Sequence, residues 1–279
     1  MSLNVAYKIR NFFVYTFLAI VMLMVLYPFI YVFAAAFAEG NTMTSLSCIP
    51  FKNGVSANNF VSLFTKTEFP TWFFNTLFIA VLSMAGSLVV CVLGAYILTR
   101  YSFPGKKKMI LVIFILQIVP SFISMIAMYY VLYRIGALDT KWGLALVYIA
   151  GNIPYNIWLV KTYMDSIPNS MEEAAKMEGA SGFTIFTKLI IPAVKPITVF
   201  LAITSFTAPW VDFVFPKLLL RSRENKTVAL GLYSLYSEQG DFGTFCAGAI
   251  FVIIPFILFF LATQNMLTES MSTSLDEDL

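Results

Sequence analysis

A long apolar run near the N-terminus, residues 12–38, reads FFVYTFLAIVMLMVLYPFIYVFAAAFA and contains no charged side chain. A helix needs about 20 apolar residues to cross the ~30 Å hydrocarbon core of a bilayer, and this run is longer than that. It is also too long for a secretory signal peptide, and no small-residue cleavage site follows it. We therefore expect it to persist in the mature protein as a membrane-spanning helix.

The same apolar character extends through the whole chain. Of its 279 residues, 59% are hydrophobic and 12% are charged, and the mean hydropathy is +0.81. A soluble domain carries about 25% charged residues, so this composition excludes a soluble enzyme. Apolar runs long enough to cross the bilayer predict an all-α polytopic membrane protein with six transmembrane helices. The six spans are expected at about residues 12–38, 72–99, 109–133, 142–163, 197–220 and 245–267.

Basic residues near the ends of the spans predict how the chain is oriented. Lys8 and Arg10 precede the first span, and residues 100–108 between the second and third spans hold one arginine and three lysines. Because positively charged connections stay in the cytoplasm, the N-terminal residues 1–11 are expected there. Six spans then place the acidic tail, residues 269–279, on the same side. The net charge of +3 is too small to indicate binding to nucleic acid.

Residue types that carry catalysis or bind metals are scarce. The chain contains no histidine, which excludes an imidazole base, a Ser-His pair and a histidine ligand. The three cysteines, Cys48, Cys91 and Cys246, are far apart in sequence and show neither a CxxC spacing nor a disulfide pattern. We therefore expect neither a catalytic residue nor a metal site in this chain.

The polar stretch at residues 164–196 differs from every other connection between spans. It includes SMEEAAKMEG at residues 170–179. Ser170 and Glu173 have the spacing of a capping box, which predicts a helix that begins one residue after the serine. Gly179 is placed to end this helix in the left-handed conformation. The sequence thus predicts a two-turn helix on the cytoplasmic side.

This short helix has two different faces. Glu172 and Lys176 are expected to pair on the solvent-facing side, while Met171, Ala174 and Ala175 form a small apolar face. A helix of this length is marginal by itself in water, so we expect the apolar face to need a partner surface. The alternative is a linker that only separates two spans, because capping boxes are common.

A second segment follows this helix directly. Ser181 is its predicted N-cap, and Phe183, Phe186 and Ile190 follow at helical spacing. We expect this segment to lie in the membrane interface before Pro192 turns the chain toward the fifth span.

The same stretch resembles the EAA motif of permease subunits of ATP-binding-cassette importers. That motif reads E-A-A, three residues, G, nine residues and then an I-x-L-P-like end. Glu173, Ala174, Ala175 and Gly179 match its first part, and Pro192 matches its last position. Near that end, this chain has Leu and Ile where the motif usually has Ile and Leu, which are conservative aliphatic exchanges.

The resemblance covers most of the chain. Several short stretches are similar to the carbohydrate-importer permeases, and within that group to the MalG-like subunits of maltose and maltodextrin importers. These stretches are FNT at 74–76, RYSFPG at 100–105, IP at 167–168, WVD at 210–212 and GDF at 240–242.

This resemblance implies a protein of the bacterial cell membrane with the type I importer permease fold. The transmembrane domain would span residues 12–268 with its core at about 72–268, embedded in membrane lipid. A second homologous permease would complete the translocation pathway, two copies of an ATPase would dock beneath it, and an extracellular solute-binding protein would deliver the sugar. The EAA helix would be the coupling helix that sits in a cleft of the ATPase.

The resemblance also implies where the chemistry takes place. The chain has no GxxxxGK[ST] phosphate loop, so it cannot itself hydrolyse ATP. ATP and Mg²⁺ would bind to the partner ATPase. This chain would be a non-catalytic subunit without a cofactor of its own.

Four polar residues within the spans are candidates for lining the pathway. Asp212 is the main ionisable residue inside a span, and it either faces a cavity or lies at the outer interface. Gln117, Asn152 and Asn156 are further candidates, although polar residues in membrane helices equally serve to join one helix to another.

The resemblance places residues 221–242 outside the membrane as a loop. In maltose-type relatives this loop reaches into the binding protein to dislodge the sugar. Tyr233, Tyr236, Glu238 and Gln239 could make that contact here. An ordinary solvated loop is the alternative.

Two other classes of function compete with an importer permease. A stand-alone secondary sugar carrier or channel usually shows internal repeats and ionisable residues near the midplane, but no convincing repeat is present. A membrane scaffold would leave the EAA residues unexplained. We therefore predict half of the translocation pathway of an oligosaccharide importer. Maltose or maltodextrin is the favoured substrate on the resemblance alone, since in maltose-type importers the sibling permease makes most of the sugar contacts.

Overall fold

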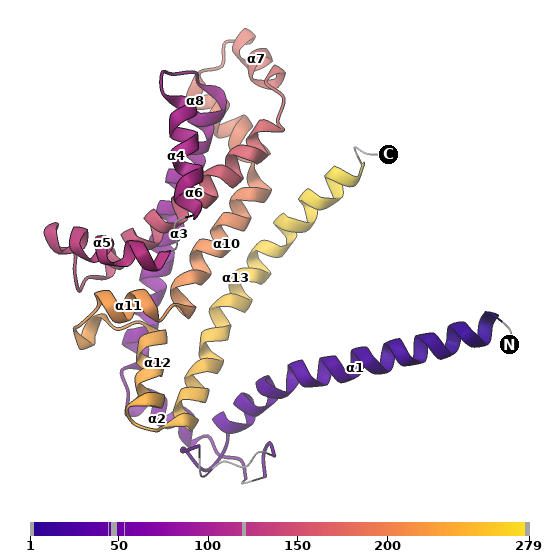
Figure 1. Cartoon of the computed structure of the whole chain (residues 1–279), viewed down its shortest axis with the longest axis vertical. Helices are drawn as coiled ribbons and strands as arrows, with labels where there is room; N and C mark the ends of the chain where they lie inside the picture. The colour runs from indigo at the N-terminus through magenta and orange to yellow at the C-terminus, as the bar shows by residue number, and fades with distance from the viewer. Residues whose placement is uncertain (1–2, 44, 46–48, 53, 119–120, 277–279) are drawn as a thin grey trace. The chain divides into compact units, whose positions relative to one another are not determined.

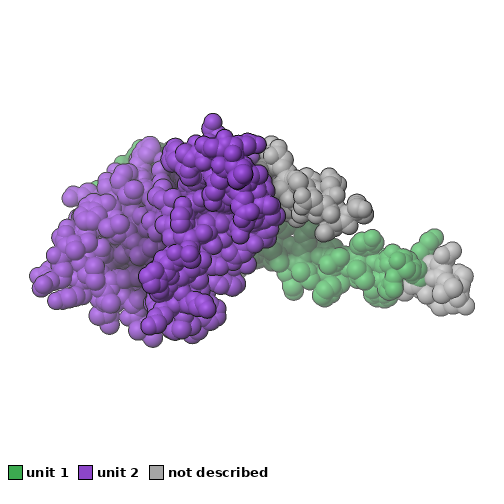
Figure 2. Space-filling view, turned by 90° about the horizontal axis from the view of Figure 1, so that it is seen from above, with its two compact units in different colours: residues 1–69, 232–253 green, residues 70–231, 254–279 purple. Residues whose placement is uncertain are grey.

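The computed structural model of the chain describes residues 3–43, 45, 49–52, 54–118 and 121–276. Every regular element in these ranges is a helix, which confirms the all-α prediction. Cys48 lies outside the described residues. The chain forms two compact units, which are coloured separately in Figure 2: residues 1–69 with 232–253, and residues 70–231 with 254–279.

The first unit contains an apolar helix that buries little of its surface within the chain. α1 (Leu3–Ala36) is 34 residues long, and every side chain from residue 12 to residue 30 is exposed. A helix that is apolar all round is stable where lipid covers it, which agrees with the first predicted span. α2 (Asn58–Thr65) is a short helix of the same unit.

Polar contacts satisfy the C-terminal end of α1. The side-chain amide of Asn59 donates hydrogen bonds to the carbonyl oxygens of Ala35, Ala36 and Ala38, at 3.3, 3.3 and 3.1 Å. A helix end leaves such carbonyls without backbone partners. The buried amide of α2 therefore caps α1 in place of water.

The second unit contains most of the helices (Figure 1). Within it, α6 packs against α4 and α10. The elements are α3 (Phe69–Arg100), α4 (Lys106–Ile118), α5 (Ser121–Arg134), α6 (Lys141–Asp165), α7 (Ser170–Met177), α8 (Gly182–Ile185), the π-helix η1 (Phe186–Ile190), α9 (Ile191–Ala193), α10 (Lys195–Val211), α11 (Val214–Leu219) and the 3-10 helix η2 (Arg223–Asn225). α12 (Val228–Ser237) and α13 (Phe242–Asp276) each contribute a part to both units.

The described residues contain between four and six candidate membrane spans. α1, α3, α6 and α13 are each long and apolar enough to cross a bilayer. Two bent helix pairs bring the number to six if each pair is one span. One pair is α4 with α5, bent by 111°, and the other is Gly182–Ala193 with α10, bent by 75°.

Two of the predicted spans are wrong in form. The third was expected as one helix over residues 109–133, but it consists of α4 and α5 on either side of a break that includes the undescribed residues 119–120. The fifth was expected over residues 197–220, but α10 ends at Val211. Asp212 is extended, with φ −78° and ψ 125°. Its Oδ1 accepts a hydrogen bond from the backbone N–H of Val214 at 2.8 Å, a local bond that competes with helix continuation.

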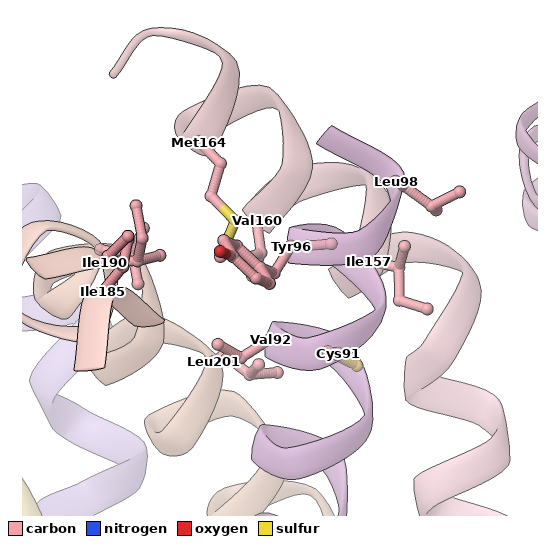
Figure 3. Close-up of a cluster of buried hydrophobic side chains, with 12 residues drawn as sticks. Cys91, Val92, Tyr96, Leu98, Ile157, Val160, Met164, Ile185, Ile190 and Leu201 are labelled. Atoms are coloured by element: carbon pink, nitrogen blue, oxygen red, sulfur yellow. The ribbon is translucent and has the colours of Figure 1, made fainter. Parts of the chain in front are cut away.

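A buried apolar cluster joins the helices of the second unit near the Arg100 end of α3 (Figure 3). It draws side chains from α3, α6, α10 and the 185–190 segment, so the polar stretch after α6 is anchored in the bundle. Its members include Tyr96, Val160, Met164, Ile185 and Ile190.

Candidate functional site

The helix predicted at the EAA residues is present as α7, but it begins differently than expected. It starts at Ser170, and the N-cap is Asn169, which has helical dihedral angles and makes no side-chain capping bond. The backbone N–H groups of Glu172 and Glu173 donate to the carbonyl oxygen of Asn169, each at 3.0 Å. The predicted capping box is therefore wrong, because Ser170 already lies inside the helix.

The end of α7 agrees with the sequence. Gly179 has φ +84°, the left-handed conformation that glycine adopts without a steric cost. Its N–H donates to the carbonyl of Lys176 at 3.0 Å, and the N–H of Ala180 donates to the carbonyl of Ala175 at 3.0 Å. This pair of bonds is a Schellman motif, which ends a helix at a glycine.

The inner face of α7 carries a buried ion pair that the sequence did not indicate. Glu172 is 4% exposed, and its carboxylate accepts a hydrogen bond from Nε of Arg100, the last residue of α3. Nη2 of the same guanidinium donates to the carbonyl of Ile167 at 3.0 Å. The predicted pairing of Glu172 with Lys176 on the solvent-facing side is therefore wrong. Sequence reasoning missed the contact because 72 residues separate the two partners.

The outer face of α7 remains open. Met171 and Met177 are 46% and 90% exposed, and Glu173 and Ala174 are exposed beside them. Ala175 packs against the buried cluster instead. The EAA residues are thus divided between the two faces, with the glutamate and the first alanine directed outward.

The segment after α7 departs from a simple helix. The Ser181 hydroxyl caps α8 by accepting a hydrogen bond from the Thr184 N–H at 3.2 Å, as predicted. Phe183 is 78% exposed whereas Ile190 is fully buried, so they do not share the predicted face. The reason is the π-helix η1, whose wider turn changes the register between them. Pro192, in α9, is exposed.

The polar residues inside the bundle join helices to one another. The side-chain amide of Asn152 donates to the hydroxyls of Ser87 and Ser205, at 3.0 and 3.1 Å, and so connects α6 with α3 and α10. Asn156 donates to the carbonyl of Asn152 one turn earlier, at 2.9 Å. Gln117 of α4 donates to the carbonyl of Pro154 in α6, at 3.1 Å.

A cavity of about 310 Å³ lies among α4, α5, α6 and α11. Asn152 is in its lining, whereas Gln117, Asn156 and Asp212 are not. Tyr148 and Phe215 also line it, with ring centroids 6.4 Å apart. The hydroxyl of Tyr148 donates to Oδ2 of Asp212 at 2.8 Å. Asp212, at the break after α10, therefore holds a side chain that lines the cavity without lining it itself. No local sequence pattern marks Tyr148, because its partner Asp212 is 64 residues away.

A second polar cluster holds residues 221–226, which we name the 221–226 loop. Oδ1 of Asp139, between α5 and α6, accepts hydrogen bonds from the N–H groups of Arg221 and Ser222 at 2.8 and 3.0 Å. Burial alone would raise the pKa of Asp139. The hydrogen bonds from Ser222, Arg221 and Asn225 outweigh that effect and hold the pKa of this carboxyl below its usual range.

The other tie to this segment comes from the start of α3. The side-chain amide of Asn75 donates to the carbonyls of Glu224 and Lys226, at 2.7 and 3.0 Å. The hydroxyl of Thr76 accepts from the N–H of Val228 at 2.9 Å. The FNT stretch that marked the resemblance therefore contains Asn75, which positions the 221–226 loop, and Thr76, which holds the start of α12.

The predicted loop over residues 221–242 is wrong in form, because it contains η2 and α12. Tyr233 and Tyr236 lie three residues apart in α12, on one side of the helix, and are 42% and 43% exposed. Glu238 and Gln239 follow the helix and are exposed.

The apolar helices that are long enough to cross a bilayer define a polytopic membrane protein. Residues 91–272 match the family model described as "Binding-protein-dependent transport system inner membrane component", and the chain belongs to this family. It is therefore a multi-pass membrane protein and a permease subunit of an ATP-binding-cassette transporter.

Relatives and solved structures agree with this assignment. The chain is 35% identical to the maltodextrin transport system permease protein MdxG of Bacillus subtilis, with 96% of this chain and 97% of that protein covered. It is also 35% identical to the galactooligosaccharides transport system permease protein GanQ of the same organism, with 95% and 94% covered. A chain of a bacterial importer of the polysaccharide alginate is similar in structure, with a TM-score of 0.79, 25% identity, and 93% and 97% covered.

Proposed function

We propose that this chain forms half of the translocation pathway of an oligosaccharide importer, with maltodextrin as the favoured sugar. The two Bacillus subtilis relatives are named for maltodextrin and for galactooligosaccharides, which supports the substrate class. Their sugars differ at the same level of identity, so the preference for maltodextrin also rests on the resemblance to MalG-like subunits and on a pneumococcal maltodextrin permease that is 32% identical.

The exposed face of α7 is the observation that carries the coupling role. Met177 is 90% exposed and Met171 is 46% exposed, although the opposite face of the same helix is locked into the bundle. Flexible methionine side chains suit a surface that another protein covers. In this proposal the helix from Glu173 to Gly179 docks in a cleft of an ATPase, which holds the ATP and Mg²⁺.

The remaining partners follow from this assignment. A second, homologous permease completes the pathway, two copies of the ATPase bind on the α7 side, and an extracellular solute-binding protein delivers the sugar. Both termini of the chain are cytoplasmic, as is α7. The transmembrane domain extends over residues 12–268, the coupling loop over 164–196, and the acidic tail follows from residue 269.

The polar residues of the bundle receive different roles in this proposal. Asn152 lines the pathway through the cavity that it shares with Tyr148 and Phe215. Asp212, Gln117 and Asn156 support the pathway without lining this cavity. Asp212 holds the break after α10 against Tyr148, and Gln117 joins α4 to α6. Asn156 bonds to the α6 backbone one turn earlier.

The segment after the 221–226 loop is the proposed contact with the binding protein. Tyr233 and Tyr236 present two half-exposed rings on one side of α12, and Glu238 and Gln239 follow them. Aromatic rings with a polar tip are common in protein interfaces, which supports this role.

The experiment that tests the function is affinity capture of the tagged chain from its native membrane, followed by reconstitution in vesicles. We expect one sibling permease and two ATPase copies for each chain, and maltodextrin uptake that requires both ATP and the binding protein. If the chain were captured alone and still moved sugar in vesicles, it would be a secondary carrier instead.

A further inference from the structure

The ion pair between Arg100 and Glu172 connects α3 with α7, the helix that is proposed to dock in the ATPase. Arg100 is the last residue of α3, and its guanidinium binds the Glu172 carboxylate of α7 and the carbonyl of Ile167. The two side chains are only 9% and 5% exposed. A guanidinium that binds two acceptors through its fork fixes both direction and distance. The beginning of the coupling loop is thus held at the end of α3.

The opposite end of α3 is attached to the 221–226 loop. The amide of Asn75 donates to the carbonyls of Glu224 and Lys226, and the hydroxyl of Thr76 accepts from the N–H of Val228. At a rise of about 1.5 Å per residue, the 25 residues between Asn75 and Arg100 span roughly 38 Å. One helix therefore connects the two segments across the bilayer.

The helix between these attachments is unlike the other long spans. α1, α6, α10 and α13 each contain an internal proline, at Pro28, Pro154, Pro209 and Pro255. α3 has a proline only in its first turn, where no intrahelical bond is lost. Proline inside a helix removes a hydrogen bond and introduces a kink. Among these spans, α3 therefore has no proline kink between its two attachments.

We infer that α3 is the rigid rod by which an ATPase movement at α7 reaches the 221–226 loop, with Arg100 and Asn75 as the positioning residues at its two ends. This inference rests on the proposed function. Neither residue needs to touch the sugar or the nucleotide. Each residue passes on a displacement because its hydrogen bonds make the attached segment move together with the end of α3.

The first test measures coupling in vesicles that contain the complete transporter. We expect Arg100→Gln and Asn75→Ala to leave the ATPase bound and active but to lower maltodextrin uptake per ATP hydrolysed about tenfold. Arg100→Lys should recover part of the loss, because lysine can still pair with Glu172. Lys161→Gln is the matched control, since it breaks the exposed pair of Lys161 and Asp165 from a residue outside the coupling loop and should behave as the wild type.

The second test does not depend on the substrate. Spin labels are placed at Ser170→Cys, the first residue of α7 and outside the docking segment Glu173–Gly179, and at Phe78→Cys on α3. Both positions are exposed, and the native cysteines of the chain are replaced by alanine. The distance between the labels should stay the same when ATP is added to the otherwise unchanged complex. It should shift by several ångströms in the Arg100→Gln variant, because α7 then moves without α3.

The outcomes separate this inference from the proposed function. A label distance that changes with ATP in the parent complex overturns the rod, as does normal uptake per ATP in both end variants. Absence of maltodextrin uptake in the parent complex contradicts the proposed substrate alone, and the label distances then decide about the rod. Loss of ATPase binding in Arg100→Gln would show that Arg100 serves docking only, which also overturns it.

Discussion

The two segments held at opposite ends of α3 are built in different ways. α7 is attached through one buried ion pair and a few small apolar contacts, and it leaves two methionines exposed. The 221–226 loop is held by several hydrogen bonds from Asp139, Asn75 and their neighbours. The buried ion pair is therefore the main attachment of α7, and the outer face of this helix stays free for a partner. The loop is fixed along its whole length.

The largest effect is expected from the exposed glutamate of α7. Glu173→Ala should reduce uptake to background without lowering the melting temperature of the complex in detergent, because Glu173 is exposed and makes no hydrogen bond through its side chain among the described residues. Uptake assays at equal membrane levels, together with thermal unfolding, check this. Uptake at the level of the unmodified protein would remove the coupling role from α7.

The C-terminal end of α7 offers a second test of the role of this helix. Gly179→Pro should also abolish uptake, because proline holds φ near −65° and cannot adopt the +84° that ends α7. Gly182→Ala is the matched control: Gly182 lies three residues later, and an added Cβ there meets no atom within 4 Å. Equal transport by the two variants would contradict the importance of this helix end.

The neighbouring buried glutamate should behave in the opposite way. Glu172→Ala leaves the Arg100 guanidinium buried without its partner, and breaking a buried pair in this manner costs about 3–5 kcal/mol. Thermal unfolding should therefore begin several degrees lower than in Glu173→Ala. If the two variants unfolded at the same temperature, the anchor at the α3 end would be unimportant for stability.

A smaller effect is expected from acid on the 221–226 loop. The pKa of Asp139 is lowered in the folded protein, so its contribution to stability is complete above the unfolded value of 3.8 and is lost as the pH falls through the lower folded value. Protection of the Ser222 amide from hydrogen exchange should persist to about pH 4 and decline below it. Asp139→Asn should weaken protection already at pH 7, whereas Glu224→Gln, a change on an exposed side chain, should not.

The smallest effect is expected from the exposed ion pair at the end of α6. Nζ of Lys161 lies 2.6 Å from Oδ2 of Asp165, four residues later in the helix, and the two side chains are 19% and 47% exposed. Such pairs contribute about 0.3–0.5 kcal/mol, so Asp165→Asn should leave the melting temperature and uptake nearly unchanged. A clear loss of stability in this variant would mean that the exposed pair of Lys161 and Asp165 contributes more than its solvent exposure predicts.

Much of the architecture was predictable because it depends on local properties of the chain. The apolar runs predicted the spans, and the left-handed glycine at 179 and the serine cap at 181 were identified from spacing alone. The breaks were less predictable. Asp212 ends α10 through its bond to the N–H of Val214 and its partner Tyr148, and Tyr148 is 64 residues away in sequence.

Local properties of the chain were enough to predict an all-α polytopic membrane protein with a short helix in the stretch between α6 and α10, because hydrophobic length and turn chemistry act within a few residues. Which of the two adjacent glutamates is buried depends instead on the tertiary structure. Glu172 and Glu173 have the same chemistry and similar helical propensity, but only the first is within reach of Arg100. A choice of that kind depends on where distant segments meet, and the local pattern carries no information about it.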